Sequence, residues 1–165
     1  MNKIKFGLPI IIYLGITFSG CQPGDEQIRK IVKEELTSGM ERAAITDANV
    51  IGPYSPAQKV GNFVFVSGQI ALNQETGLLE NQDIETETKR VLENLILILE
   101  KTGCDSSEVI SATVYLKDIN DYAKMNNIYG GYFQAGNYPA RVTVQVAALP
   151  KNARVEISAI AYKSK

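Results

Sequence analysis

The chain has 165 residues, which suits one well-packed domain and is too short for two comfortable ones. Its 17 Lys and Arg balance 18 Asp and Glu without long runs of one sign, so the chain lacks the basic face that nucleic-acid binding requires. It contains no His and only two Cys, Cys21 and Cys104. This composition excludes His-based nucleophile pairs, His metal ligands and a four-thiolate zinc site, and we predict no metal. Any catalysis must use carboxylates, Arg, hydroxyls, backbone groups and water.

The first residues have the order of a signal peptide. Lys3 and Lys5 precede an apolar stretch over residues 6–18, and a Ser-Gly pair precedes Cys21. The stretch is shorter than the ~20 residues of a membrane span. The pattern resembles a bacterial lipobox, which implies that residues 1–20 are removed and that Cys21 is lipidated. We therefore expect a domain in the cell envelope that faces the periplasm or the exterior and meets the membrane through its lipid anchor only; an uncleaved anchor with an incidental Cys is the alternative.

Residues 21–45 form a charged segment that we interpret as a tether. Ile28, Ile31, Val32 and Leu36 recur at helical spacing within it, which predicts a short amphipathic helix. Such a helix is either a solvated spacer or a partner-binding element, and the spacer is the simpler interpretation.

The domain is predicted from residue 46 to residue 165 and alternates strand and helix patterns. A helix is expected between Asp83, a good N-cap, and Gly103, a good C-cap. The remaining predictions are a strand over residues 62–72 that enters a hairpin, a strand over 106–118, a second helix over 119–133, and two buried strands joined by a short turn within 138–161.

This succession predicts an α+β fold with a single mixed β-sheet and two helices packed on one face. Several strands are apolar on both sides, so the other sheet face needs a cover. We expect neighbouring subunits to supply that cover, and therefore an oligomer.

Two ions interrupt the apolar pattern of the last two strands, Arg141 and Glu156. They are either a buried ion pair that stabilises the sheet or the oligomer, or functional groups. From the residues alone, both interpretations remain open.

Several motifs resemble the YjgF, or Rid, family of enamine/imine deaminases over residues 46–163. They are IGPYSPA at 51–57, FVSGQIALN at 65–73, LEKTGCD at the end of the first helix, VYLKDINDYAKMN at 114–126, and YPARVTVQVAALPKNARVEISAIA at 138–161. The resemblance implies a chorismate-mutase-like fold and a homotrimer with ligand clefts between subunits.

The resemblance also implies roles for the two ions. Arg141 matches the arginine that binds the substrate carboxylate, and Glu156 matches the acidic residue that handles protons and the attacking water. The substrate-binding positions that the resemblance adds are Tyr54, Ser67, Gly68, Asn126 and Thr143. Taken alone, Tyr54 could merely pack over a turn and Ser67 could merely satisfy a strand end.

The implied reaction is hydrolysis of a small 2-imino acid or its enamine, such as 2-iminopropanoate or 2-aminoacrylate, to a 2-keto acid and ammonia. The implied ligand is therefore a small 2-imino or 2-keto acid, and no cofactor is required. The alternative is a non-catalytic trimer that binds small carboxylates or acts as a scaffold at the envelope.

Overall fold

The computed structural model describes residues 26–31, 42–45 and 50–164. Residues 1–20, the lipidation candidate Cys21, and Val32 and Leu36 lie outside the described residues. Residues 26–31 form a short exposed helix within a separate N-terminal unit, residues 1–36. Within the described ranges, no helix combines the length and the apolar character of a membrane span.

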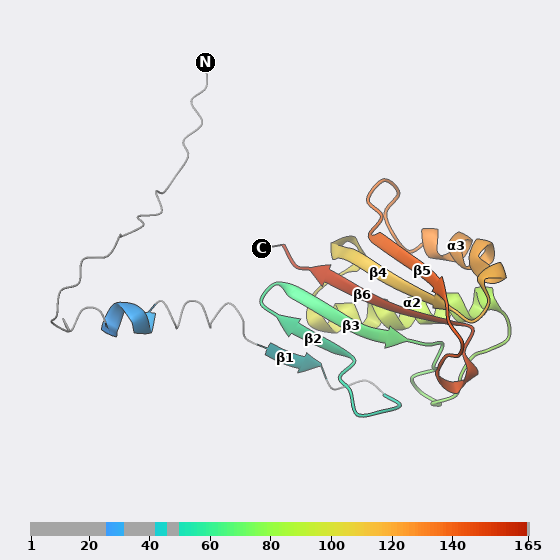
Figure 1. The fold of residues 1–165 in the computed structure, drawn as a ribbon, viewed down its shortest axis with the longest axis horizontal. Helices are drawn as coiled ribbons and strands as arrows, with labels where there is room; N and C mark the ends of the chain where they lie inside the picture. Colours follow the sequence, from blue (N-terminus) through green and yellow to red (C-terminus); the bar gives the residue numbers. More distant parts are fainter. Residues whose placement is uncertain (1–25, 32–41, 46–49, 165) are drawn as a thin grey trace, which may run out of the picture. The chain divides into compact units, whose positions relative to one another are not determined.

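The second unit is built on one six-stranded sheet with the order β1-β2-β3-β6-β4-β5 (Figure 1). All neighbouring strands are antiparallel except β4 and β5, which are parallel, so the sheet is mixed as predicted. The strands are β1 Arg42–Ile45, β2 Ala57–Val60, β3 Phe63–Gln69, β4 Val109–Leu116, β5 Ala140–Gln145 and β6 Val155–Tyr162.

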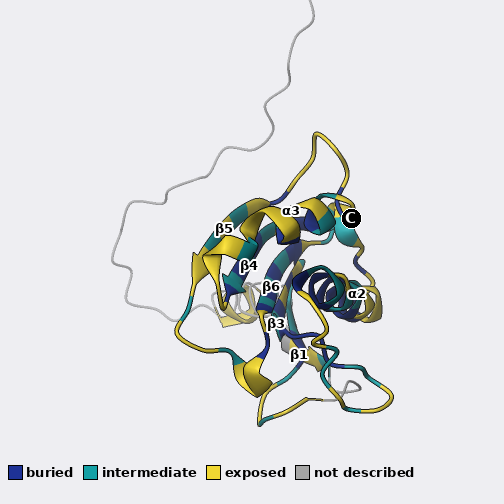
Figure 2. Ribbon diagram, turned by 90° about the vertical axis from the view of Figure 1, so that its right-hand side faces the viewer, coloured by how far each residue is buried: buried dark blue, intermediate teal, exposed yellow. Residues whose placement is uncertain are grey.

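Two helices cover one face of this sheet, α2 Ile84–Thr102 and α3 Tyr122–Gly130 (Figure 2). The caps of α2 are those that the sequence predicts: the Asp83 side chain accepts from the Thr86 N–H, and Gly103 is left-handed at φ 78°. Its buried stripe, which includes Leu92, Leu95 and Leu99, packs on β3 and β6. Short 3-10 turns complete the domain: η1 Ser106–Glu108, η2 Ile119–Asp121 and η3 Pro150–Asn152.

The two faces of the sheet differ in burial because side chains alternate along each strand. In β6, residues 155, 157, 159 and 161 are buried beneath the helices, whereas 156, 158, 160 and 162 lie on the open face. The open face carries large exposed apolar side chains: Phe63, Phe65, Val142, Val144 and Tyr162. This agrees with the predicted need for a cover, and the trimer itself remains a prediction.

The expectation of two buried, turn-linked strands at the end of the chain is wrong. β5 and β6 are separated in the sheet by β4, and residues 146–154 connect them. β5 is an exposed edge strand that joins β4 in parallel, which is possible because α3 provides the crossover that a parallel pair requires.

The sequence patterns also missed two strands. β2 and β3 form a hairpin around Gly61, which has φ 57°, and β1 pairs with β2. The two missed strands, β1 and β2, are short, and their polar residues hide the alternation of apolar side chains. The sheet therefore starts at Arg42, ahead of the boundary expected at residue 46.

Candidate active site

Arg141 lies on the edge strand β5, and helix α3 holds it in place. Its Nη2 donates to Asn126 Oδ1 at 2.7 Å and to Tyr122 Oη at 3.1 Å. Its Cζ lies 4.4 Å from the centroid of the Tyr129 ring, within cation–π range. A hydrogen-bonded and stacked guanidinium has little rotamer freedom left, so its orientation is set before a ligand arrives.

The spacing of these partners explains why α3 can hold an arginine. Tyr122, Asn126 and Tyr129 stand at i, i+4 and i+7, so they share one helix face, and that face lies against Arg141. Asn126, whose role the resemblance left open, thus orients the guanidinium. Tyr122 and Tyr129 were not predicted as site residues, although their spacing from Asn126 was a usable signal.

Arg141 opens onto a cleft of about 400 Å³. Both hydrogen bonds to Asn126 and Tyr122 come from Nη2, so Nε and Nη1 are the donors that a ligand can use. Burial raises the pKa of Tyr129 to about 12, with the charge of Arg141 acting against it, so this ring is neutral around pH 7. The cleft is lined by Asn126, Tyr129, Gly130, Tyr138, Pro139 and Arg141.

Glu156 points away from Arg141, to the other face of the sheet. Arg141 and Ala159 both pair with Ala112, which places Arg141 on the helix-covered side, whereas Glu156 pairs with Tyr115 and lies on the open side. No ion pair joins Arg141 and Glu156 in the part of the chain that the structure describes. The buried-pair interpretation is therefore wrong within one chain.

The Glu156 carboxyl lies against the backbone of Gly68 on β3. A Cβ added to Gly68 would stand 1.9 Å from Glu156 Oε1 and 2.7 Å from its Cδ, so any other residue at position 68 would force the carboxyl out of its present place. Glu156 is half-buried, and burial raises the pKa of its carboxyl. Within the described ranges it has no hydrogen-bond partner, so packing and backbone position alone determine where it lies.

Ser67 and Tyr54 belong to the same region as Gly68. Ser67 Oγ donates to the Ser55 carbonyl at 2.7 Å, and its N–H donates to the Pro56 carbonyl at 2.9 Å. These bonds join β3 to the segment that carries Tyr54, whose side chain is 43% exposed. Ser67 therefore has the structural role considered as its alternative, and its hydroxyl oxygen can still accept a bond.

Thr143 stands on β5, two residues beyond Arg141 and on the same side of the strand. Its Oγ1 is buried and has no hydrogen-bond partner among the described residues. Its hydroxyl is thus not presented to the cleft, and its backbone is the part that remains available for the predicted ligand contact.

The predicted residues and those that the structure adds lie on two sides of the sheet, as two half-sites of one chain. The arginine half-site consists of Arg141 and Asn126, which were predicted, with Tyr122, Tyr129 and Tyr138, which were not; Thr143 lies on its side of β5. The glutamate half-site consists of Glu156 and Gly68, with Ser67 joining β3 to the segment that carries Tyr54.

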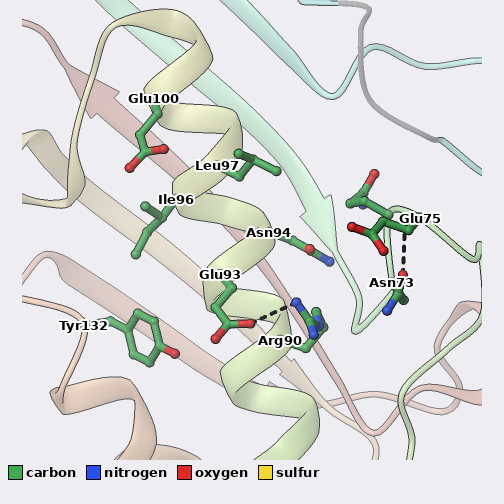
Figure 3. A pocket seen from close by; sticks show the side chains of 10 residues that line it. Asn73, Glu75, Arg90, Glu93, Asn94, Ile96, Leu97, Glu100 and Tyr132 are labelled. Carbon is green, nitrogen blue, oxygen red and sulfur yellow. Dashed lines mark hydrogen bonds and ion pairs between the residues drawn. The ribbon is translucent and has the colours of Figure 1, made fainter.

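A larger concavity of about 650 Å³ lies elsewhere, beside the outer face of α2 (Figure 3). It contains none of the predicted site residues. Its only cation among the lining residues, Arg90, is already engaged by Glu80 at 2.8 Å and Glu93 at 3.0 Å. Among the described residues, no group of three or more Asp, Glu, Cys or His is arranged to hold a metal ion.

Comparison with known proteins decides the family. The model of the Endoribonuclease L-PSP family matches residues 41–163. The chain belongs to this family. The family includes YjgF and RidA proteins, so the resemblance inferred from the motifs is confirmed.

Individual members of the L-PSP family match over most of their length. A RutC family protein of Pyrococcus abyssi is 55% identical over 113 residues, which are 68% of this chain and 88% of that protein. The human 2-iminobutanoate/2-iminopropanoate deaminase is 43% identical over 129 residues, 76% of this chain and 93% of its own. The solved structure of E. coli TdcF with bound serine aligns with a TM-score of 0.66 at 35% identity, covering 76% of this chain and 98% of TdcF.

Proposed function

We propose that this protein hydrolyses small 2-imino acids and their enamine tautomers to 2-keto acids and ammonia. The observation that carries the proposal is the Arg141 guanidinium, which is pre-oriented by α3 and opens onto a cleft with free donors. Relatives at 43% to 50% identity that are named 2-iminobutanoate/2-iminopropanoate deaminase support the same chemistry.

Arg141 binds the substrate carboxylate. A guanidinium can bind a carboxylate with two bonds through its Nη1–Nη2 edge or its Nε–Nη2 edge. Both edges include Nη2, which already donates to Asn126 and Tyr122, so one of these two bonds must give way to the substrate. The Tyr122 bond is the longer of the two and the more exposed, so it is the one we expect a substrate oxygen to replace.

Glu156 acts as the general acid and base. In the proposed reaction, water adds to the imine carbon, the nitrogen gains protons, the carbon–nitrogen bond breaks, and ammonia leaves with the keto acid behind. Burial moves the pKa of Glu156 upward, toward the range in which a carboxyl accepts and returns a proton. Arg141 fixes the carbon relative to this group, which lowers the entropic barrier.

Because the two half-sites lie on opposite sides of the sheet, a site that uses both needs two chains. β5 is an exposed edge, and the open face offers the apolar surface that an oligomer would bury. We propose a homotrimer in which Arg141 of one subunit faces Glu156 of the next.

The activity is tested with a coupled hydrolysis assay, in which 2-iminopropanoate is generated in place and semicarbazide traps the remaining imine. We expect the protein to reduce the trapped imine, and Arg141→Ala to abolish the effect while circular dichroism stays unchanged. Arg141→Lys, which keeps the charge and loses the fork, should recover only part of it. Binding of pyruvate by calorimetry without any rate enhancement would instead favour a non-catalytic carboxylate-binding protein.

The shared site is tested by mixing inactive chains. Arg141→Ala and Glu156→Gln are each expected to be inactive. In a randomly mixed trimer, about a quarter of the intersubunit sites regain both groups, so about a quarter of the wild-type activity should return. No recovery at all in verified mixed oligomers would place both groups of each site in one chain.

We also propose that the domain is exported and lipid-anchored at the envelope, on the strength of the order of charge, apolar stretch and Cys21 in the sequence. Palmitate labelling that is lost in Cys21→Ala would support the anchor. Equal labelling of both proteins, or none, would overturn it.

A further inference from the structure

Glu87 is a fully buried carboxylate on α2, with 0% of its surface exposed. Its Oε2 accepts the backbone N–H of Arg154 at 2.8 Å, and its Oε1 lies 3.7 Å from Arg154 Nε. Burying an acidic group is costly unless hydrogen bonds or an ion pair compensate it, and here the only direct hydrogen bond within the described residues is the one from the Arg154 N–H. The proposed reaction does not use it directly.

The residue that Glu87 contacts is fixed from two sides. The Arg154 N–H is held by Glu87, and the Arg154 carbonyl accepts the Lys117 N–H at 2.8 Å. Arg154 is thereby clamped between α2 and the end of β4. It immediately precedes β6, and the next outward-facing residue of the chain is Glu156.

The segment before Arg154 contains strained backbone. Lys151 and Asn152 have φ values of 53° and 62°, which is left-handed backbone at two consecutive residues that are not glycine. Backbone of this kind is unfavourable for residues with a side chain and persists only where its surroundings hold it. The Lys117 side chain donates to Asn152 Oδ1, so β4 supports this loop as well.

We propose that Glu87 is a positioning residue for Glu156. The inference rests on the proposed function, in which Glu156 handles protons. Within the described residues Glu156 has no side-chain partner, and its carboxyl occupies the space that the missing side chain of Gly68 leaves, so the placement of β6 decides where the carboxyl lies. Glu87 fixes the start of β6 together with the β4–β6 ladder, because it supplies the acceptor that the Arg154 N–H needs inside the protein, one residue before the pairing of Val155 with Leu116.

The decisive comparison is Glu87→Gln against Glu87→Met. The two replacements are uncharged and similar in volume, and only Gln keeps an oxygen for the Arg154 N–H. We expect Gln to retain most of the activity and Met to lower kcat on the order of 10–100-fold, the effect of a small displacement of a reacting group, with KM within about twofold of wild type. Faster hydrogen exchange of the Arg154 amide in the Met protein should accompany this loss.

Equal kcat for the Gln and Met proteins would overturn the proposal, as would a loss in Met that appears in KM alone. If Glu87→Met does not fold, Glu87→Asp serves instead, because it keeps the charge and withdraws the oxygen by one methylene. Glu87→Asp should lower kcat and leave KM unchanged, and an unchanged kcat would overturn the proposal. Glu156→Gln distinguishes failure of the proposed function from failure of the positioning role of Glu87. A fully active Glu156→Gln protein would show that the proposed role of Glu156 is wrong. An inactive Glu156→Gln protein beside a fully active Glu87→Met protein would show that only the role of Glu87 is wrong.

Discussion

The two half-sites are held in place by opposite means. Arg141 is bonded or stacked by three side chains of one helix face, at 2.7 Å, 3.1 Å and 4.4 Å. Glu156 has no such partner in the described part of the chain and is located by strand register and by the close approach of Gly68. In the proposed site, the carboxylate-binding group is thus fixed by direct contacts, whereas the group proposed to transfer protons has no such contacts and can change its charge.

This difference follows from where the residues of each half-site lie in the sequence. Arg141 and its partners come from one contiguous crossover, β4 through α3 to β5. Glu156 and Gly68 come from strands far apart in sequence that meet only in the assembled sheet. The first half-site is therefore sensitive to single side chains and the second to backbone placement.

Gly68→Ala should give the largest effect, because it attacks the half-site that depends on backbone proximity. The new methyl group would occupy the space of the Glu156 carboxyl, and we expect kcat to fall about 100-fold or more. Gly131→Ala is the matched control, since a Cβ there meets only Ile128 O at an ordinary 3.5 Å. Steady-state kinetics of both proteins decide the matter, and a Gly68→Ala protein with wild-type kcat would contradict the contact.

Asn126→Ala tests the arginine half-site and should act on binding. It removes the 2.7 Å acceptor of a charged donor, a bond of roughly 1.5–3 kcal/mol, so we expect the Kd for pyruvate to rise about 10–100-fold. Asn127→Ala, one residue along the same helix and exposed, is the control. Calorimetry gives Kd directly; an unchanged Kd would mean that Tyr122 and Tyr129 suffice to hold Arg141.

Thr143→Val tests how much stability is lost by burying the Thr143 hydroxyl without a hydrogen-bond partner, on the same strand as Arg141. The Thr143 hydroxyl is buried without a partner in the described chain, and replacing it by a methyl group removes that penalty. We expect the free energy of unfolding to increase by up to about 1 kcal/mol, measured by urea denaturation. A decrease of similar size would show that the hydroxyl is satisfied in solution.

Glu156→Gln, which should abolish activity, is expected to give the smallest change in stability and to reveal the cost of the unpaired carboxyl. Burial raises the pKa of Glu156 in the folded protein above its ordinary 4.5. At pH values between the ordinary pKa and the raised pKa, the folded state therefore binds more protons than the unfolded state. The contribution of Glu156 to stability is present below pH 4.5 and is lost as pH rises through the raised pKa. We therefore expect Glu156→Gln to raise Tm by about one or two degrees at neutral pH and not at pH 4.

Thermal scans at both pH values test this sign. A lower Tm for Glu156→Gln at neutral pH would indicate that the ionised carboxylate gains a favourable partner, for example across a subunit interface. That outcome would remove the contrast between the two half-sites.

The parts that the sequence predicted well are those encoded locally. The α2 helix follows from Asp83 and Gly103, whose capping depends on a few neighbouring residues. The two-faced sheet follows from alternation along each strand. Arg141 and Glu156 were recognisable as exceptions to that alternation, and the family motifs added Gly68 and Asn126.

The rest depends on strand order, which no local pattern encodes. β4 lies between β5 and β6, so a segment that looks like a hairpin is divided, and the alternation that suggested a pair of neighbouring ions leaves Arg141 and Glu156 on different faces. The holding of Arg141 by Tyr122 and Tyr129 was missed for a related reason, because aromatic residues at helical spacing usually belong to a core.

The crossover from β4 through α3 to β5 has a consequence for how this architecture diversifies. In the proposed site, the arginine that binds small acids and its partners lie in one short stretch of chain, and the glutamate comes from a different strand. We therefore expect that replacing this one glutamate converts a catalyst into a receptor for the same ligands without rebuilding the arginine half-site, and that the reverse change requires only one carboxyl opposite a glycine.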